Sequence, residues 1–179
     1  AIRQDNYDVD YQNYYTFLGV LPQRELFVAT ANALLKTGDK ERALKVLDKC
    51  QESMPDHVWP LESIPLGFYT NDYMVVNMVS DYFAAGAPDK AADLGARLGK
   101  ELLATANFYM QFYEYAADDF ERACQFLYYL IDELEKGGEK TVSHDLKLSL
   151  VAMMRSSIPD EEVAGYAPAD SSENTDIQK

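Results

Sequence analysis

The most constraining feature of the sequence is the stretch from residue 27 to residue 55, where two helical patterns meet at Gly38. Glycine accepts the left-handed backbone that ends a helix, and Asp39 can cap the free N–H groups that begin the next one. Pro55 stops the second pattern, because proline restricts the residue before it. Two short helices joined by a tight turn are therefore predicted. Their apolar and small residues recur at helical spacing: Phe27, Thr30, Ala31, Leu34, Leu35, and then Ala43, Leu44, Leu47, Cys50, Met54.

The same stretch resembles a tetratricopeptide repeat (TPR), a helix–turn–helix unit of about 34 residues. The family places an aromatic, a small and a large apolar residue along its first helix, and these places are taken by Phe27, Ala31 and Leu34. The second helix and its end carry the matching residues Ala43, Leu47, Cys50 and Pro55. The resemblance implies a scaffold rather than a chemistry.

A second helix pair follows, in which Gly86 corresponds to Gly38 and Pro88 suits the first turn of a helix. Gly95 stands where the first repeat has Leu47, so weaker packing is expected there. From about residue 118 a third apolar stripe predicts another helix, which ends at Gly137 and Gly138 and is followed by a last helix over about 140–156.

These patterns divide the chain into three parts. Residues 1–21 are an acidic, tyrosine-rich segment, predicted to be an extended lead-in. Residues 159–179 are too polar to offset the entropy of ordering, which predicts a flexible tail. Residues 22–158 are predicted to form an all-α domain. The TPR resemblance implies a right-handed α-α superhelix of about three helical hairpins, over about 22–57, 68–115 and 118–157.

Prolines set several boundaries within the domain. Pro22 suits a first helical turn, so the first helix is predicted over about 22–37 and the second over about 40–54. Pro55, Pro60 and Pro65 prevent a long helix in the next segment. Trp59, the only tryptophan, is expected to fill the gap between the first two helix pairs.

Composition limits the classes of partner. The 179 residues carry a formal charge of −14, which repels nucleic acid and anionic lipid and favours a basic peptide or a cationic ligand. The same charge also fits a role in solubility alone. Cys50 and Cys124 lie in helical patterns, which indicates buried thiols rather than a disulfide. The sequence has no apolar run of about 18 residues, the length that a membrane-spanning helix needs.

Residues that could carry chemistry are sparse. The sequence has no phosphate-binding glycine loop, G-x-S-x-G, C-x-x-C or H-E-x-x-H motif. His57 and His144 stand alone. Asp8 and Asp10 form a D-x-D pattern that can hold a divalent cation, but the pattern is common by chance. We therefore predict no catalytic residue, cofactor or metal site in this region, and no enzyme activity of its own.

An aromatic band is the densest unusual feature. Aromatic side chains bury a large area and keep a polar group available, which suits both cores and interfaces. We expect these rings mainly to pack the fourth helix on the fifth, with some left for a partner. The band comprises Phe108, Tyr109, Phe112, Tyr113, Tyr115, Phe120, Phe126, Tyr128 and Tyr129.

The TPR resemblance implies a concave face, lined by the first helix of each pair, that holds a peptide. Mapped by position, that face comprises Glu25, Val28, Asn32, Lys36, Tyr73, Asn77 and Ser80. Asn32 and Asn77 resemble the asparagines of TPR domains that clamp a terminal carboxylate. Val28 stands where the clamp has a lysine, and the negative charge also argues against a carboxylate ligand.

A narrower resemblance covers about residues 30–55 and fades after Leu98. The segment from Ala43 to Cys50, followed by Met54 and Pro55, is similar to the soluble C-terminal region of a bacterial family of polytopic membrane proteins of uncharacterised function. The membrane part of that family resembles protein O-mannosyltransferases. The start at Ala1 instead of Met suggests a processed chain or a part of a longer protein. The resemblance implies a domain of the cell envelope, tethered to a membrane-spanning part that would hold any glycosyl transfer.

The leading hypothesis is a non-catalytic module that binds a protein or peptide. Two alternatives remain open. One is an accessory domain of a membrane glycosyltransferase-like enzyme that uses Asp8 and Asp10. The other is a helical domain that binds a carbohydrate or another small ligand through its tyrosines.

Overall fold

The structure is a computed structural model that describes residues 14–62 and 71–156. Within these ranges all regular structure is helical, and the all-α prediction is confirmed there. Residues 1–13, the segment 63–70 and the predicted tail lie outside the described residues. The helices are α1 (Tyr14–Lys36), α2 (Lys40–Ser53), α3 (Asn71–Ala85), α4 (Pro88–Met110), α5 (Tyr113–Lys136) and α6 (Lys140–Ser156).

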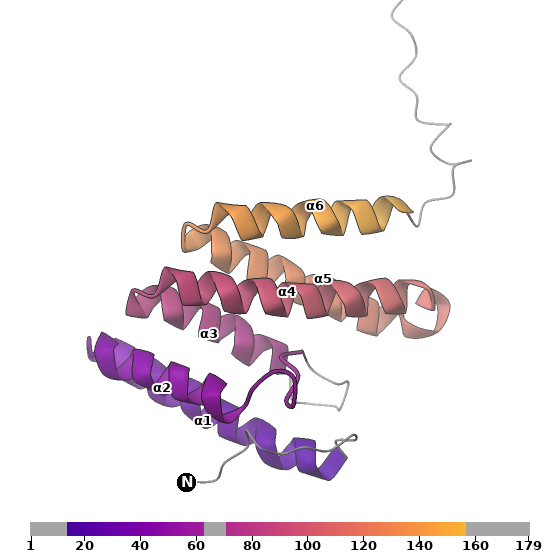
Figure 1. The fold of residues 1–179 in the computed structure, drawn as a ribbon. Coiled ribbons are helices and arrows are strands. Elements are labelled where there is room, and N and C mark those ends of the chain that lie inside the picture. The colour runs from indigo at the N-terminus through magenta and orange to yellow at the C-terminus, as the bar shows by residue number, and fades with distance from the viewer. Residues whose placement is uncertain (1–13, 63–70, 157–179) are drawn as a thin grey trace, which may run out of the picture.

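Helices that follow one another pack as three hairpins, α1–α2, α3–α4 and α5–α6 (Figure 1). The hairpins stack in the order of the sequence. Helix α3 packs against both α1 and α2, α5 packs against α3 and α4, and α6 also packs against α4. The first helices α1, α3 and α5 therefore form one layer, and α4 and α6 lie in front of α3 and α5 in Figure 1.

The same backbone turn closes the first helix of each hairpin. Each turn contains a glycine with positive φ, at 82° for Gly38, 87° for Gly86 and 85° for Gly138. The N–H after this glycine donates to a carbonyl oxygen five residues earlier, a bond typical of a helix that ends in a left-handed residue. The three bonds are Asp39 N to Leu34 O, Ala87 N to Tyr82 O and Glu139 N to Leu134 O, at 2.9, 2.9 and 2.8 Å. The glycine turns predicted from the sequence are confirmed.

Two helix starts follow the sequence prediction. The Asp39 side chain accepts a hydrogen bond from the Arg42 N–H at 3.1 Å, so this residue caps α2 as predicted. Pro88 occupies the first turn of α4, where its missing N–H costs no helical hydrogen bond.

Helix α1 begins before the predicted boundary. It starts at Tyr14, so residues 14–21 are helical where an extended segment was expected. Pro22 lies inside the helix instead of in its first turn. A proline within a helix removes one hydrogen bond and costs about 3 kcal/mol, which is why the sequence pattern favoured a start at Pro22.

The boundary between α4 and α5 also differs from the prediction. Helix α4 ends at Met110, although the second hairpin was predicted to extend to about residue 115, and α5 begins at Tyr113 rather than near residue 118. Ala116 has non-helical angles (φ −136°, ψ 33°) and produces a kink. The third apolar stripe therefore identified the part of α5 that follows the kink.

Two glycines on α4 bring the third hairpin close. A Cβ added to Gly95 would lie 2.9 Å from Leu134 Cδ2 on α5, and one added to Gly99 would lie 2.5 Å from Leu146 Cδ2 on α6. The prediction of weaker packing at Gly95 is wrong, because the leucine side chain fills the space that a larger residue would take. Cys50 and Cys124 are buried and free, as predicted.

The segment that follows α2 is held by residues from three helices. Trp59 is buried, with 1% of its surface exposed, as expected of a residue that fills a gap. Arg24 on α1 donates to the carbonyl oxygens of Trp59 and Pro60, both at 3.0 Å. Glu101 on α4 accepts the N–H groups of Leu61 and Glu62, also at 3.0 Å. The segment also contacts α5, because the Glu62 carboxylate lies 3.7 Å from the guanidinium of Arg122.

None of the described helices combines the length and the apolar character needed to cross a lipid bilayer.

Candidate functional site

The seven residues predicted to bind a partner lie on α1 and α3, which pack against each other. Glu25, Lys36 and Tyr73 are exposed and can contact a partner. Asn77 and Ser80 are half-buried. Partner binding by these five residues stays a prediction.

The other two predicted residues serve the packing of α1. Val28 is part of the hydrophobic core and does not present its side chain at the surface, so its assignment to a binding face is corrected. Asn32 is half-buried, and its Nδ2 donates to Asp81 Oδ2 on α3 at 2.8 Å and to the Val28 carbonyl oxygen at 3.2 Å. The Asn32 amide therefore joins the first hairpin to the second.

Asp81 is a buried carboxyl group that the sequence reasoning missed. Only 6% of its surface is exposed, and burial raises its pKa to about 6. Met78, three residues before Asp81 and on the same side of α3, is also buried, and this helical spacing was the one sequence signal for its burial. In the folded protein Asp81 accepts the Asn32 hydrogen bond, so it stabilises the contact between α1 and α3 at the cost of burying a charge.

Asp81→Asn should stabilise the protein above pH 6. Because the pKa in the folded state lies above the unfolded value of about 3.9, the folded state binds more protons between these values. The free energy of unfolding of the wild type therefore falls as the pH rises through this window. The variant keeps an acceptor for Asn32 and should gain about 1–3 kcal/mol at about pH 8 relative to the wild type, and much less at about pH 4.5. Urea denaturation at both pH values measures the difference.

The control for this prediction is Asp145→Asn, which changes an exposed carboxylate on α6. This variant should keep the pH dependence of the wild type. An Asp81→Asn variant that changes stability equally at both pH values would contradict the role assigned to Asp81.

Exposed rings gather where α4 meets α5. We call the surface of Phe108, Phe112, Tyr113 and Tyr115 the aromatic corner. Their side chains are between 48% and 90% exposed, with Tyr115 at the upper end. The rings of Phe108 and Phe112 lie 5.3 Å apart between centroids, at an angle of 53°.

The aromatic band packs differently from the prediction. Phe126 is its one buried member, whereas Tyr109 and Phe120 are half-buried and the other six rings are exposed, Tyr128 and Tyr129 among them. Leucine and alanine side chains fill the core between the helices and leave most rings outside. These residues are Leu94, Leu98, Leu102, Ala106, Ala123, Leu127, Leu130 and Leu134.

Carboxylates accompany the rings of the aromatic corner along α5. Glu114, Asp118 and Glu121 are exposed on α5 near the rings, and the Tyr113 hydroxyl donates to Glu121 Oε1 at 3.5 Å. Asp119 is half-buried, 3.9 Å from the guanidinium of Arg122. The corner therefore combines apolar ring surface with negative charge.

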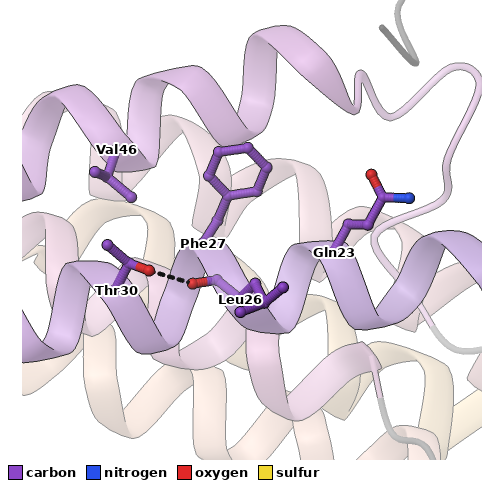
Figure 2. Close-up of a pocket in the computed structure, with 5 residues that line it drawn as sticks. All are labelled: Gln23, Leu26, Phe27, Thr30 and Val46. Atoms are coloured by element: carbon purple, nitrogen blue, oxygen red, sulfur yellow. Dashed lines mark hydrogen bonds between the residues drawn. The ribbon is translucent and has the colours of Figure 1, made fainter. Parts of the chain in front are cut away.

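A shallow apolar groove lies between α1 and α2 (Figure 2). Its volume is about 330 Å³, and the Leu26 side chain at its rim is 68% exposed. The Phe27 ring points toward α2, and the Thr30 hydroxyl donates to the Leu26 carbonyl oxygen at 2.7 Å. The lining carries no charge and no catalytic group. It comprises Gln23, Leu26, Phe27, Thr30 and Val46.

Two polar cavities lie near α2 and α4. A groove of about 450 Å³ contains Asp48 and Lys90, whose ammonium contacts both carboxylate oxygens at 2.7 Å. A cavity of about 200 Å³ is lined by Arg97 and Cys50 among others. Burial raises the pKa of the Cys50 thiol to about 11, so the thiol stays protonated at neutral pH and is a poor nucleophile. Neither cavity brings together an acid, a base and a nucleophile.

The described ranges, 14–62 and 71–156, contain no assembled site for metal binding or for catalysis by histidine. No group of three or more histidine, cysteine or carboxylate side chains is placed there to hold a metal ion. His57 and His144 are exposed on different elements. Asp8 and Asp10, the residues of the D-x-D pattern, lie outside the described residues.

Comparison of the chain with family models, with curated proteins and with solved structures finds no match in any of the three. The surfaces of the described residues are therefore the basis for assigning a function.

Proposed function

We propose that this chain is a TPR-like module that binds a protein partner at the aromatic corner. The observation that carries the proposal is the exposure of the four rings at one connection of a fold whose core is filled by other residues. Aromatic residues are enriched at the centres of protein interfaces, and large exposed apolar patches mark interaction sites. The module contributes no catalytic residue of its own.

Three features support the TPR-like part of the proposal. The helices form successive hairpins, the first helices of the hairpins make one layer, and the same glycine turn recurs in each hairpin. Stacked hairpins of this kind form a right-handed superhelix in TPR arrays, with a face for extended partners. Glu25, Lys36 and Tyr73 would then form a second contact with the partner on the face of α1 and α3.

The resemblance of residues 30–55 supports a place for the module at the soluble end of a bacterial membrane protein. Binding at the aromatic corner would hold a partner near that membrane protein. A transferase activity would belong to the membrane part, and the module would act as its scaffold.

Site-specific photo-crosslinking in the full-length protein, in its native cells, tests the proposal. The photoreactive residue p-benzoylphenylalanine replaces Tyr115, which is the most exposed ring of the corner. The matched control carries it at Lys49, an exposed residue of α2. We expect a protein adduct from the Tyr115 position alone. Equal adducts from both positions, or none from Tyr115, would remove the proposed function.

Carbohydrate binding is a second candidate for the same surface. Tyrosine rings beside carboxylates can stack on sugar rings and accept hydrogen bonds from their hydroxyl groups, and Tyr115 and Asp118 offer this combination. A glycan array separates the two candidates. Glycan binding that Tyr115→Ala abolishes, without a protein adduct, would favour the carbohydrate.

A further inference from the structure

We infer that the partner segment bound at the aromatic corner is cationic and contains arginine. This inference rests on the proposed function and specifies the chemistry of its partner. It follows from the juxtaposition of exposed rings and exposed carboxylates around the α4–α5 connection.

The rings provide the apolar part of the site. Tyr115 is 90% exposed, and Phe108 and Phe112 form a tilted pair beside it along the chain. A guanidinium group stacks on such rings through cation–π and planar contacts, and it is more weakly hydrated than an ammonium group. Exposed rings therefore favour arginine over lysine.

The carboxylates provide the charge. Residues 107–125 contain four acidic residues, Glu114, Asp118, Asp119 and Glu121, and one basic residue, so their formal charge is 1 − 4 = −3. The basic residue, Arg122, already faces Glu62 and Asp119 at 3.7 and 3.9 Å. The exposed carboxylates Glu114 and Asp118 can accept paired hydrogen bonds from a guanidinium fork.

Three other described surfaces differ from the corner. Tyr128 and Tyr129 are also exposed on α5, but the nearby Asp132 carboxylate is paired with Lys136 at 2.6 Å. The groove between α1 and α2 has an apolar lining without charge. In the groove between α2 and α4, Asp48 is paired with Lys90 at 2.7 Å, and Asp93 is paired with Arg97 at 2.9 Å. Compared with these surfaces, the aromatic corner combines exposed rings with excess negative charge.

Fluorescence anisotropy with three labelled peptides tests the inference. The peptides alternate leucine with arginine, with lysine or with glutamate, and each has about nine residues. The arginine peptide should bind at least about threefold more tightly than the lysine peptide, and the glutamate peptide should not bind. Raising the salt from about 0.05 M to about 0.5 M should weaken binding, because the exposed charges are screened.

Variants show whether the binding is local. Tyr115→Ala and the double variant Glu114→Gln, Asp118→Asn should each weaken binding of the arginine peptide about three- to tenfold. Tyr128→Ala, which removes an exposed ring elsewhere on α5, should leave it unchanged. Circular dichroism checks that each variant is folded. Equal binding of the arginine and glutamate peptides, or affinities unchanged in both corner variants, would overturn the inference.

The crosslinked adduct separates this inference from the proposed function. Mass spectrometry of the Tyr115 adduct identifies the segment that lies at the corner. A segment with arginine near the crosslink supports both proposals. A segment without arginine overturns the inference and keeps the proposed function. Absence of any adduct removes the proposed function and the inference with it.

Discussion

Replacing Arg24 by methionine should lower the free energy of unfolding by about 2–4 kcal/mol. Arg24 is 2% exposed, and the two terminal nitrogens of its guanidinium donate to the carbonyl oxygens of Pro60 and Trp59, each at 3.0 Å. Methionine can fill the space of the aliphatic stem but offers no donor. Two carbonyl groups would then lose charged donors, which is the largest part of the expected cost.

Trp59 provides the measurement for this variant. It is the only tryptophan and lies in the segment that Arg24 holds, so its fluorescence during urea denaturation reports on that segment directly. Arg42→Met is the control, because the Arg42 side chain is 69% exposed and its ion pair with Asp39 should contribute less than about 1 kcal/mol. Equal stability of Arg24→Met and the wild type would contradict the role of Arg24.

The segment after α2 joins the first hairpin to the second because it is held from both sides. Arg24 on α1 binds two of its carbonyl oxygens, and Glu101 on α4 accepts two of its N–H groups. Burial lowers the pKa of Arg24 and raises the pKa of Glu101. Both shifts reflect the cost of burying a charge, which the hydrogen bonds to the backbone offset.

The hairpins could be predicted from the sequence because their signals are local. Gly38 and Gly86 mark the turns, Asp39 and Pro88 mark the helix starts, and the periodic apolar residues mark the buried faces. Each signal acts within one or two helical turns, so no knowledge of the tertiary structure is needed. These signals set most of the helix boundaries, and the exceptions lie at Pro22 and near the kink in α5.

The contacts of Arg24 could not be predicted in the same way. Its partners are 35 and 36 residues away in the chain, and a charged residue in a helix ordinarily faces solvent. Arg24, Val28 and Ala31 follow each other at intervals of four and three residues and are all buried. The sequence analysis placed Val28 on a binding face and therefore did not recognise this buried stripe. The Asn32–Asp81 hydrogen bond was also not predicted, because its two residues are 49 positions apart in the chain.

The concentration of rings in the aromatic corner could be predicted from the sequence, but their exposure could not. Whether the rings face the core depends on which residues fill the space between α4 and α5. Leucines such as Leu98 and Leu127 fill it, and the glycines of α4 let the third hairpin approach closely. The aliphatic side chains therefore occupy the core and the rings lie at the surface. This outcome depends on the tertiary packing of α4, α5 and α6, which the local sequence pattern does not contain.

Trp59→Ala should have the largest effect on stability, about 3–5 kcal/mol, because it removes a large side chain that is almost completely buried. Trp59→Phe, which keeps an aromatic ring, should cost less than half of that amount. Far-UV circular dichroism during urea denaturation measures both variants, since the tryptophan signal is lost. A cost below about 1 kcal/mol for Trp59→Ala would contradict the stabilising role assigned to the buried Trp59 side chain.

The double variant Arg24→Met, Trp59→Ala tests whether the two residues hold the same segment. If they do, loss of one releases the backbone that the other needs, and the second substitution then costs less than it does alone. The combined loss should fall short of the sum of the single losses by about 1 kcal/mol or more. A sum within about 0.3 kcal/mol of additivity would mean that Trp59 stabilises the core independently of the hydrogen bonds from Arg24. Sub-additive losses would instead place the contact between the first two hairpins in one cooperative unit formed by α1, the segment after α2, and α4.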